Sequence, residues 1–461
     1  MSRETTPCEE KENMKVKEIC DMKKFIAGAL AFATALTVFT GCGGAAGSST
    51  AQTSGSTAAG STAAGSTASG EQQVLKVATW DYTSNPSVSN SVKAFEAANP
   101  NIKIEILDIP STDYNTKLNV MLNGGSDLDA YFIKDASSTY DLYKKNQLLD
   151  LTDYIEADGV DMSAYNGTDT PFNIEGRQYG MPVRTDYYVL FYNKDLFDAA
   201  NMEYPSNDMT WSEFEDLAMQ ISEAADCYGA YFHTWQACVQ NWGVQDGEHT
   251  IMDYDTNYDF FKPYYEMVLR LQDAGAIQEF GELQSGNIHY SGAFAAGNVA
   301  MMPMGTWYMA TIAESIKNGE ANLKEWGVAT LPHPDNVSAG YTVGATTPIV
   351  INPASQKQDL AWQFVKFMSG EESANEYAKV GAIPGRLNDE ILALVQEQEG
   401  MPEGLAEALK VENIVADRPI QESVTEVNDM LGQEHSLIML KECSVDEGLA
   451  NMGARAAEIL K

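Results

Sequence analysis

The chain has 461 residues, of which 44% are hydrophobic, so wholesale disorder is excluded. At roughly 150 residues per domain, this length suggests two or three domains. Acidic residues outnumber basic ones by 66 to 29, and the net charge of −37 argues against nucleic acid and anionic lipid surfaces as partners. The chain contains 22 tyrosines, an excess that indicates rings used for recognition.

The N-terminal 41 residues predict a secretion signal. Lys23 and Lys24 form a positive region, and the apolar run Phe25 to Phe39 follows. This run is shorter than the roughly 20 residues that span a bilayer. Met22 opens a normal signal by itself, so residues 1–21 read as an upstream extension, and the true start is Met1, Met14 or Met22.

The signal ends at Thr40-Gly41-Cys42, which resembles a bacterial lipobox, although Phe39 stands where Leu is usual. The resemblance implies that Cys42 becomes the first mature residue and carries a diacylglycerol, with palmitate among its acyl chains. An uncleaved anchor and a plain secretory signal are the alternatives. Residues 42–73 repeat the unit Gly-Ser-Thr-Ala and contain nothing that builds a core. They predict a flexible tether with a reach of about 30 Å.

The folded body begins with an alternation of strands and helices. Strands are expected at Val74 to Trp80, Ile102 to Ile106 and Leu128 to Ile133, and helices at 86–98 and 114–122. This order predicts a parallel α/β layer structure.

A second unit is expected to begin near Tyr187. Its predicted elements are a strand at 188–192, a helix opened by the capping box Thr210-Trp211-Ser212-Glu213, a helix running into a strand over 293–304, strands at 326–331 and 347–351, and a helix through Trp362. The tail from Asp389 reads as helical and acidic. Two α/β lobes with repeated chain crossings are the simplest interpretation.

Familiar catalytic motifs are missing from the sequence. It has no phosphate-binding Gly loop followed by Lys and no Gly-x-Ser-x-Gly elbow, and its five His lie at no ligand spacing, so neither a cofactor nor a metal is predicted. Cys227, Cys238 and Cys443 are an odd number for an exported domain. Cys227 and Cys238 pair with each other or remain buried free thiols.

Ordered motifs over nearly the whole body resemble one family, the extracellular solute-binding lipoproteins of bacterial ABC importers, of the maltose/oligosaccharide-binding type. The motifs are Val74 to Trp80, Phe95-Glu96-Ala97-Ala98-Asn99-Pro100, Gly180-Met181-Pro182, Tyr192-Asn193-Lys194-Asp195-Leu196-Phe197, the box at Thr210, Phe294 to Met301 with Gly305-Thr306-Trp307, Trp326-Gly327-Val328 with Leu331-Pro332, and Gly381-Ala382-Ile383-Pro384-Gly385-Arg386.

The resemblance implies a two-lobe α/β fold of the type II periplasmic-binding-protein kind, with a hinge and an interlobe ligand cleft. Lobe 1 would comprise 74–183 and 346–384, and lobe 2 would comprise 184–345 and 385–461, with crossings near Pro182, Gly344-Ala345-Thr346 and Pro384-Gly385-Arg386. The implied protein is a monomeric receptor without catalysis. It would stand on the outer face of the cell membrane, held only by its lipid, and would hand a carbohydrate to the transmembrane subunits of an ABC permease.

A sugar site needs aromatic platforms beside planar polar groups. The resemblance places a stacking ring at Trp307, and Trp80, Tyr188 and Trp235 are further candidate rings; a core position is the alternative for Trp307 and Tyr188. The Trp235 stretch also contains Tyr231, His233 and Trp242, which are assigned to core or rim. Trp211, Trp326 and Trp362 are assigned to the core, and Met301, Met302 and Met304 to a packing layer beneath Trp307.

Three charged residues complete the predicted site. Asp81 follows the first strand, at the edge where α/β sheets bind ligands, with helix capping as the alternative. Asp135 follows the third strand, where the family often has a carboxylate for sugar hydroxyls, with a solvated turn as the alternative. Arg386 either donates paired hydrogen bonds to hydroxyls or a carboxylate, or only braces the hinge.

Three functions compete at this point. The first is carbohydrate capture by cleft closure, driven by the ligand's higher affinity for the closed form. The second keeps the fold but binds a polyamine, an osmolyte amine or a peptide, which Asp81 and Asp135 would suit. The third is a surface glycosidase, which needs two carboxylates roughly 5–10 Å apart.

Overall fold

The computed structural model describes residues 72–165 and 167–461. The predicted signal, Cys42 and nearly all of the predicted tether lie outside this range. No helix in the described part of the chain is long and apolar enough to cross a membrane.

The strands are β1 (Gln73–Trp80), β2 (Ile102–Ile109), β3 (Ala130–Phe132), β4 (Asn173–Ile174), β5 (Arg177–Gln178), β6 (Met181–Asn193), β7 (Tyr228–Ala230), β8 (Val299–Gly305), β9 (Trp326–Thr330), β10 (Tyr341–Ile351) and β11 (Asn413–Ala416). The α-helices are α2 (Pro86–Ala98), α3 (Tyr114–Asn123), α4 (Thr139–Lys144), α5 (Thr152–Asp158), α6 (Lys194–Ala200), α7 (Trp211–Ala225), α8 (Ala237–Val244), α9 (Lys262–Asp273), α10 (Phe280–Ser285), α11 (Tyr290–Ala295), α12 (Met309–Lys317), α13 (Gln358–Met368), α14 (Glu371–Ala378), α15 (Asp389–Gln396), α16 (Leu405–Ala408), α17 (Val424–Met439) and α18 (Val445–Ile459). Short 3-10 turns include η2 (Ala136–Ser138) and η7 (Thr306–Tyr308).

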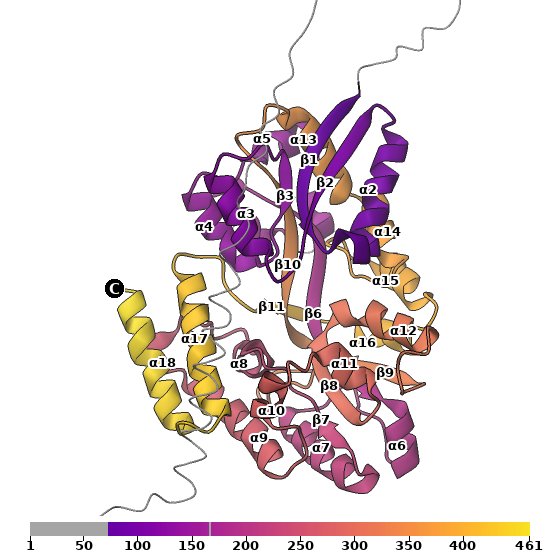
Figure 1. The fold of residues 1–461 in the computed structure, drawn as a ribbon, viewed down its shortest axis with the longest axis vertical. Coiled ribbons are helices and arrows are strands. Elements are labelled where there is room, and N and C mark those ends of the chain that lie inside the picture. The colour runs from indigo at the N-terminus through magenta and orange to yellow at the C-terminus, as the bar shows by residue number, and fades with distance from the viewer. Residues whose placement is uncertain (1–71, 166) are drawn as a thin grey trace, which may run out of the picture. The chain divides into compact units, whose positions relative to one another are not determined.

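The first lobe is the parallel layer structure that the sequence predicts. β1 pairs in parallel with β2 on one side and with β3 on the other. Leu75 and Val77 pack with α2 and α13 on one face, whereas Ala78 packs with α3 on the opposite face. This alternation follows from the two-residue period of a strand, and it buries both faces of the sheet (Figure 1).

The second lobe is built on the same principle. Tyr188, Leu190 and Tyr192 of β6 pack on one face with α7, α9 and α17, while Val189 and Phe191 pack on the other face with α12, α15 and α16. The capping box at Thr210 is present and opens α7 as expected. Trp211, Trp326 and Trp362 are 4–5% exposed and Met301, Met302 and Met304 are fully buried, which confirms their assignment to packing positions.

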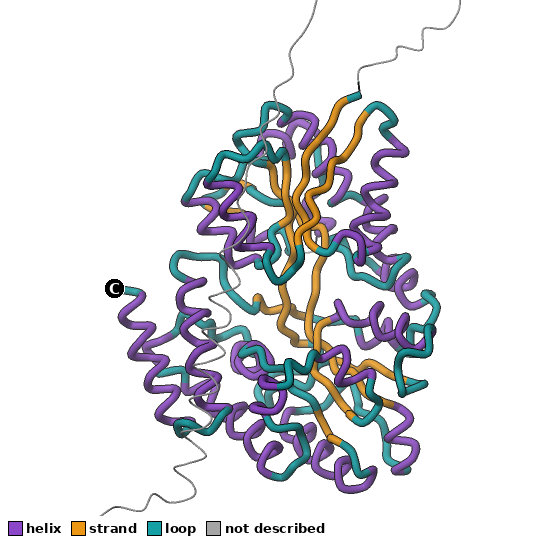
Figure 2. Tube along the Cα trace, viewed as in Figure 1, coloured by secondary structure: helices purple, strands orange, loops and turns teal. Residues whose placement is uncertain are grey.

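Two long antiparallel strands, β6 and β10, connect the lobes. From Met181 to Tyr187, β6 pairs with β10, and from Tyr188 to Asn193 it pairs with β8 and β9. Figure 2 shows both strands running from one lobe into the other. The change of partner at Tyr187 and Tyr188 falls where the sequence predicts the second unit to begin. The exact lobe bounds stay a prediction.

Two of the three predicted crossings fall inside strands and not between elements. Pro182 lies inside β6, and Gly344-Ala345-Thr346 lies inside β10. A Cβ on Gly344 would stand 2.4 Å from the carbonyl oxygen of Asp186, so this glycine permits close strand pairing. At the third crossing, the Gly385 amide donates to the carbonyl of Val183 at 2.9 Å, so that segment lies against β6.

The tail differs from the wholly helical prediction. β11 adds a short strand to β10, with Gly344 opposite Ala416. The chain then forms the helical hairpin α17–α18, drawn in yellow in Figure 1. The sequence did not predict this strand, because it is only four residues long and is only partly buried. The pairing of β11 with β10 nevertheless places the residues after β11 at the crossing between the lobes.

Candidate functional site

The Trp307 indole is held in a fixed orientation after β8. It lies in η7 and is half-buried, with its ring packed over Gly305. A Cβ on Gly305 would lie 1.9 Å from the indole, so only glycine leaves room for this ring position. The Tyr188 ring meets Trp307 edge-on, with centroids 5.4 Å apart. Trp307 is therefore packed against Gly305 and Tyr188 and remains half-buried.

Tyr188 belongs to a row of rings that supports Trp307 from the core. Tyr188 is 4% exposed and contacts Trp242 edge-on at 5.3 Å, and Trp242 in turn lies 4.7 Å from Trp211. The Trp211 Nε1–H donates to Gln245 at 2.9 Å. Tyr188 and Trp242 therefore act mainly as packing that positions Trp307.

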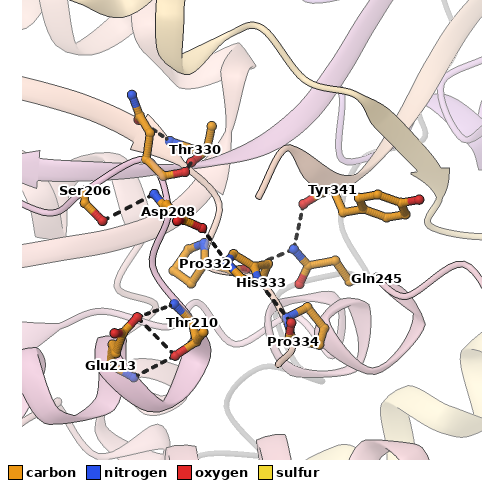
Figure 3. Close-up of polar contacts among 11 residues, drawn as sticks. Ser206, Asp208, Thr210, Glu213, Gln245, Thr330, Pro332, His333, Pro334 and Tyr341 are labelled. Carbon is orange, nitrogen blue, oxygen red and sulfur yellow. Dashed lines mark hydrogen bonds and ion pairs between the residues drawn. The ribbon is translucent and has the colours of Figure 1, made fainter. Parts of the chain in front are cut away.

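The row of rings is anchored to the connecting strand β10 through Gln245. Its side-chain amide donates to the carbonyls of Pro332 at 2.9 Å and Tyr341 at 2.8 Å (Figure 3). Tyr341 is the first residue of β10, so the amide ties the support of Trp307 to the interlobe connection. A buried amide with its donors and its acceptor satisfied makes such a link rigid.

Trp235 extends the aromatic surface beyond Trp307. It is 40% exposed, an unusual exposure for a large ring, and its centroid lies 6.5 Å from that of Trp307. His233 meets it edge-on at 4.5 Å, and Tyr290 lies at 5.6 Å. Burial, aided by the charge of His289, lowers the pKa of His233 to about 4. At neutral pH His233 is therefore uncharged, and the side chains around Trp235 are aromatic.

A polar pair that sequence reasoning missed lies beside these rings. Asp417 and Arg418 follow β11, and the Asp417 amide donates to the Gly344 carbonyl at 3.0 Å. Arg418 is 8% exposed, and its Nη1 donates to Asn241 Oδ1 at 2.9 Å. Burial raises the pKa of Tyr188 well above its usual range, and the charges of Asp417 and Arg418 act on it in opposite directions. The pair is therefore close to the ring that supports Trp307.

The first lobe presents Asp135 to this polar pair. Asp135 is exposed after β3 and accepts a hydrogen bond from Asn115. Burial raises the pKa of Asp417, and the negative charge of Asp135 adds to that shift. Partial desolvation and the same Asp135 charge also raise the pKa of Asp429 on α17. The charge of Asp135 in the first lobe thus acts on two carboxylates of the second lobe.

A direct contact between the lobes flanks these carboxylates. The Thr425 hydroxyl of α17 donates to Asp141 of α4 at 3.3 Å. On the second-lobe side, the Gln236 amide donates to Asn428 Oδ1 at 3.2 Å. Gln236 follows Trp235, so this hydrogen bond joins the loop of the exposed indole to Asn428 of α17, which also accepts from Arg418 Nε.

Two further predicted residues stand at the end of β1 in the first lobe. Trp80 is half-buried and packs edge-on against Tyr114, with centroids 5.2 Å apart. The Asp81 carboxylate accepts from the Ser111 amide at 3.0 Å and makes no helix-capping bond. These contacts hold the end of β1.

Arg386 is separate from the aromatic surface. Its guanidinium lies over the Tyr165 ring at 5.6 Å. It lines two surface cavities of about 500 and 540 Å³ among α13, α14 and α15, and neither cavity includes Trp235 or Trp307. These contacts place Arg386 beside α14 and α15, near the third crossing.

Other chemistry is not indicated in the described part of the chain. It contains no group of three or more His, Cys, Asp or Glu side chains placed to hold a metal ion. Cys227, Cys238 and Cys443 are all free thiols, which decides between the two open alternatives for Cys227 and Cys238. Burial raises the pKa of Cys227 to about 11 and that of Cys238 to about 12, so neither is a reactive thiolate at neutral pH.

Known proteins share both sequence and fold with this chain. The profile of a family described as bacterial extracellular solute-binding protein matches residues 90–402. A sugar transporter from Rhizobium etli, solved in an open conformation, has a TM-score of 0.75 and 35% identity, covering 83% of this chain and 99% of that chain. An ABC substrate-binding protein from Listeria monocytogenes, solved with cycloalternan, has a TM-score of 0.72 and 24% identity, covering 85% of this chain and 99% of that chain.

A curated relative gives a further match. An arabinooligosaccharide-binding protein of Halalkalibacterium halodurans is 24% identical over 246 residues, which are 50% of this chain and 52% of the relative. The family profile covers well over half of the chain, and the two-lobe α/β fold agrees with the solved structures. The chain therefore belongs to the bacterial extracellular solute-binding proteins.

Proposed function

We propose that the protein captures a carbohydrate, most simply an oligosaccharide, between its lobes and delivers it to an ABC permease without chemical change. The observation that carries this proposal is the half-buried Trp307 indole, held by Gly305 and Tyr188, with the exposed Trp235 ring 6.5 Å away. A pyranose has apolar C–H faces and a rim of hydroxyls. Trp307 and Trp235 offer rings for the faces, and Arg418 and Asp417 offer polar groups for the rim.

The comparisons support the choice of ligand class. The Rhizobium etli structure is named a sugar transporter, the Listeria protein was solved with cycloalternan, and the Halalkalibacterium relative is named for arabinooligosaccharides. Their ligands differ, so they support carbohydrate as the class and leave the individual sugar open. The family's extracellular location agrees with the predicted export signal.

Anchoring and assembly complete the proposal. The mature protein would begin at Cys42, carry its lipid there, and stand on the outer face of the membrane as a monomer on its tether. The lobes would close about Pro182, Ala345 and Pro384, with lobe 1 as 74–183 and 346–384 and lobe 2 as 184–345 and 385–461. The proposed ligand contacts also include Trp80, Asp81, Asp135, Tyr188 and Arg386.

A cationic solute is the second candidate, because Asp135, Asp417 and Asp429 bring three carboxylates to the interlobe region. The buried Arg418 among them disfavours it, since a cation would meet a fixed positive charge. A polyamine would favour a site with carboxylates and no guanidinium.

A thermal-shift screen tests the proposal and separates the two candidates. The panel contains mono- and oligosaccharides, polyamines and quaternary amines. Ligand at 100 times its Kd adds about 2.7 kcal/mol to the free energy of unfolding, which gives a clear rise in Tm. We expect stabilisation by one or more oligosaccharides and none by the amines. Stabilisation by amines alone would replace the carbohydrate proposal with the second candidate.

A further inference from the structure

We propose that Arg418, together with Asp417, makes this site select uncharged sugars and discriminate against sugars that carry a carboxylate. The inference rests on the proposed carbohydrate function and adds the chemical class of sugar. Neither residue was among those expected from the sequence.

The first step is the way the guanidinium of Arg418 is held. Its Nε donates to Asn428 Oδ1, and its Nη1 donates to Asn241 Oδ1 at 2.9 Å and to the Asp417 carbonyl at 2.6 Å. Three of its five N–H groups are thereby used. Nη2 has no hydrogen-bond partner among the described residues, although the side chain is 92% buried, as its 8% exposure shows. An Arg held so rigidly with one nitrogen left over is built to donate to a ligand.

The second step is the kind of ligand group that this nitrogen accepts. A carboxylate binds Arg best through two parallel N–H donors on adjacent nitrogens. That mode needs Nη2 together with Nε or Nη1, and both of these are occupied by Asn428, Asn241 and Asp417. A hydroxyl needs only one donor, so Nη2 alone suits it.

The third step is the charge around Arg418. The carboxylates of Asp417 and Asp429 lie in the second lobe, and Asp135 acts on both from the first lobe. Asp417 is the carboxylate that acts on Arg418, and the charge of Asp135 acts on Asp417 in turn. A ligand carboxylate would add a further negative charge in a partly desolvated place, which is unfavourable. A ligand hydroxyl accepts from Arg418 and donates to Asp417 without any added charge.

The fourth step places the pair beside the rings. β11 sets Asp417 against Gly344, which pairs on its other edge with Tyr187 of β6. The next residue of β6, Tyr188, contacts Trp307. Gln236 joins the Trp235 loop to Asn428, which holds Arg418. A sugar stacked on Trp307 therefore has Arg418 and Asp417 within the same surface.

The test uses calorimetric titration of the soluble mature chain. The probes are a panel of neutral oligosaccharides, including maltotriose and arabinotriose, and the C6-oxidised uronate of each glucose-based member. We expect the wild type to bind a neutral member at least roughly tenfold more tightly than its uronate. Arg418→Gln should weaken neutral binding roughly 10- to 100-fold, since a charge-assisted hydrogen bond is lost. Asp417→Asn should narrow the ratio of neutral to uronate affinity, a change that a merely structural role would not produce.

Matched controls keep the outcomes distinct. Arg455→Gln removes an arginine of the same lobe that pairs with Glu434 of α17, and it should leave both affinities unchanged. If Arg418→Gln does not fold, the ratio of neutral to uronate affinity measured for Asp417→Asn decides whether the inference holds. Equal or tighter uronate binding by the wild type, or unchanged affinity in folded Arg418→Gln, would overturn this inference alone. Absence of any binding by the wild type across the whole panel would overturn the carbohydrate proposal and this inference together.

Discussion

The orientation of the Trp307 indole depends on the absence of a side chain at Gly305. The indole occupies the space that a Cβ would take, with three of its ring atoms within 2.2 Å of the position of that Cβ. The ring cannot share this space, so the glycine is a requirement of the site. This gives the Gly-Thr-Trp motif a physical reason that needs no knowledge of the ligand.

Adding a single methyl group at position 305 should therefore weaken sugar binding. We expect Gly305→Ala to displace the indole and lower the affinity for the sugar found in the screen roughly tenfold or more. Gly292→Ala is the matched control, because a Cβ there meets nothing within 4 Å. Calorimetric titration of both variants gives the comparison. Equal affinities would show that the position of this ring does not matter for binding.

The helix α17 carries a buried polar group with a predictable effect on stability. The Nδ1 atom of His435 shares a hydrogen bond with the Tyr265 hydroxyl at 3.0 Å. Its Nε2 atom has no hydrogen-bond partner among the described residues. Burial lowers the pKa of His435 from 6.5 to about 3. The unfolded chain therefore takes up a proton as the pH falls below about 6.5, while the folded chain does not.

It follows that this group lowers the free energy of unfolding as the pH falls from about 6.5 towards 3. We expect His435→Gln to reduce the slope of stability against pH in this window by up to about 1.4 kcal/mol per pH unit. Urea melts at several pH values measure the slope. An unchanged slope in His435→Gln would mean that His435 titrates normally in the folded protein.

Elements with strong local periodicity could be predicted from the sequence, and elements defined by pairing could not. The β1 strand alternates cleanly because its two faces pack against different helices. The lengths of β6 and β10 escaped prediction because Pro182 and Gly344 read as breakers, whereas in the fold they sit within paired strands. Their role depends on neighbours far away in sequence.

The same distinction applies to the site. Trp307 and Trp235 were predicted because aromatic residues in a family motif and in a dense stretch are visible along the chain. Arg418 was not, because its role depends on Asn241 and Asn428, which only the fold brings to it. The one available signal was the charged pair Asp417-Arg418 directly before Pro419, at the end of a short β-branched run.

For the whole molecule, the connecting strands predict a hinge motion. The lobes are joined by β6, β10 and the segment at Gly385, and they touch across Thr425 and Asp141. We expect the radius of gyration to decrease when the sugar saturates the protein, because the ligand favours the closed form. Small-angle scattering with and without ligand measures this. An unchanged radius at saturation would argue against closure.

The membrane attachment is testable on the intact cell product. We expect mass spectrometry of membrane-extracted protein to find a diacylglycerol on Cys42, because the predicted signal ends at Thr40-Gly41-Cys42. Cys42→Ser should release the protein from the membrane. Release of unmodified protein by wild-type cells, with no change in Cys42→Ser, would rule out the lipid anchor.

The central claim is that the Trp307 surface between the lobes binds the sugar, and calorimetric titration of Trp307→Ala tests it most directly. Loss of a stacked indole should weaken binding about 30-fold, which corresponds to about 2 kcal/mol, with near-normal stability in a denaturant melt. Trp362→Ala, in the core of the other lobe, should instead lose about 3–5 kcal/mol of stability and keep its affinity. If Trp307→Ala loses stability in the same way and its folded fraction binds as well as the wild type, Trp307 is a core residue and the site lies elsewhere.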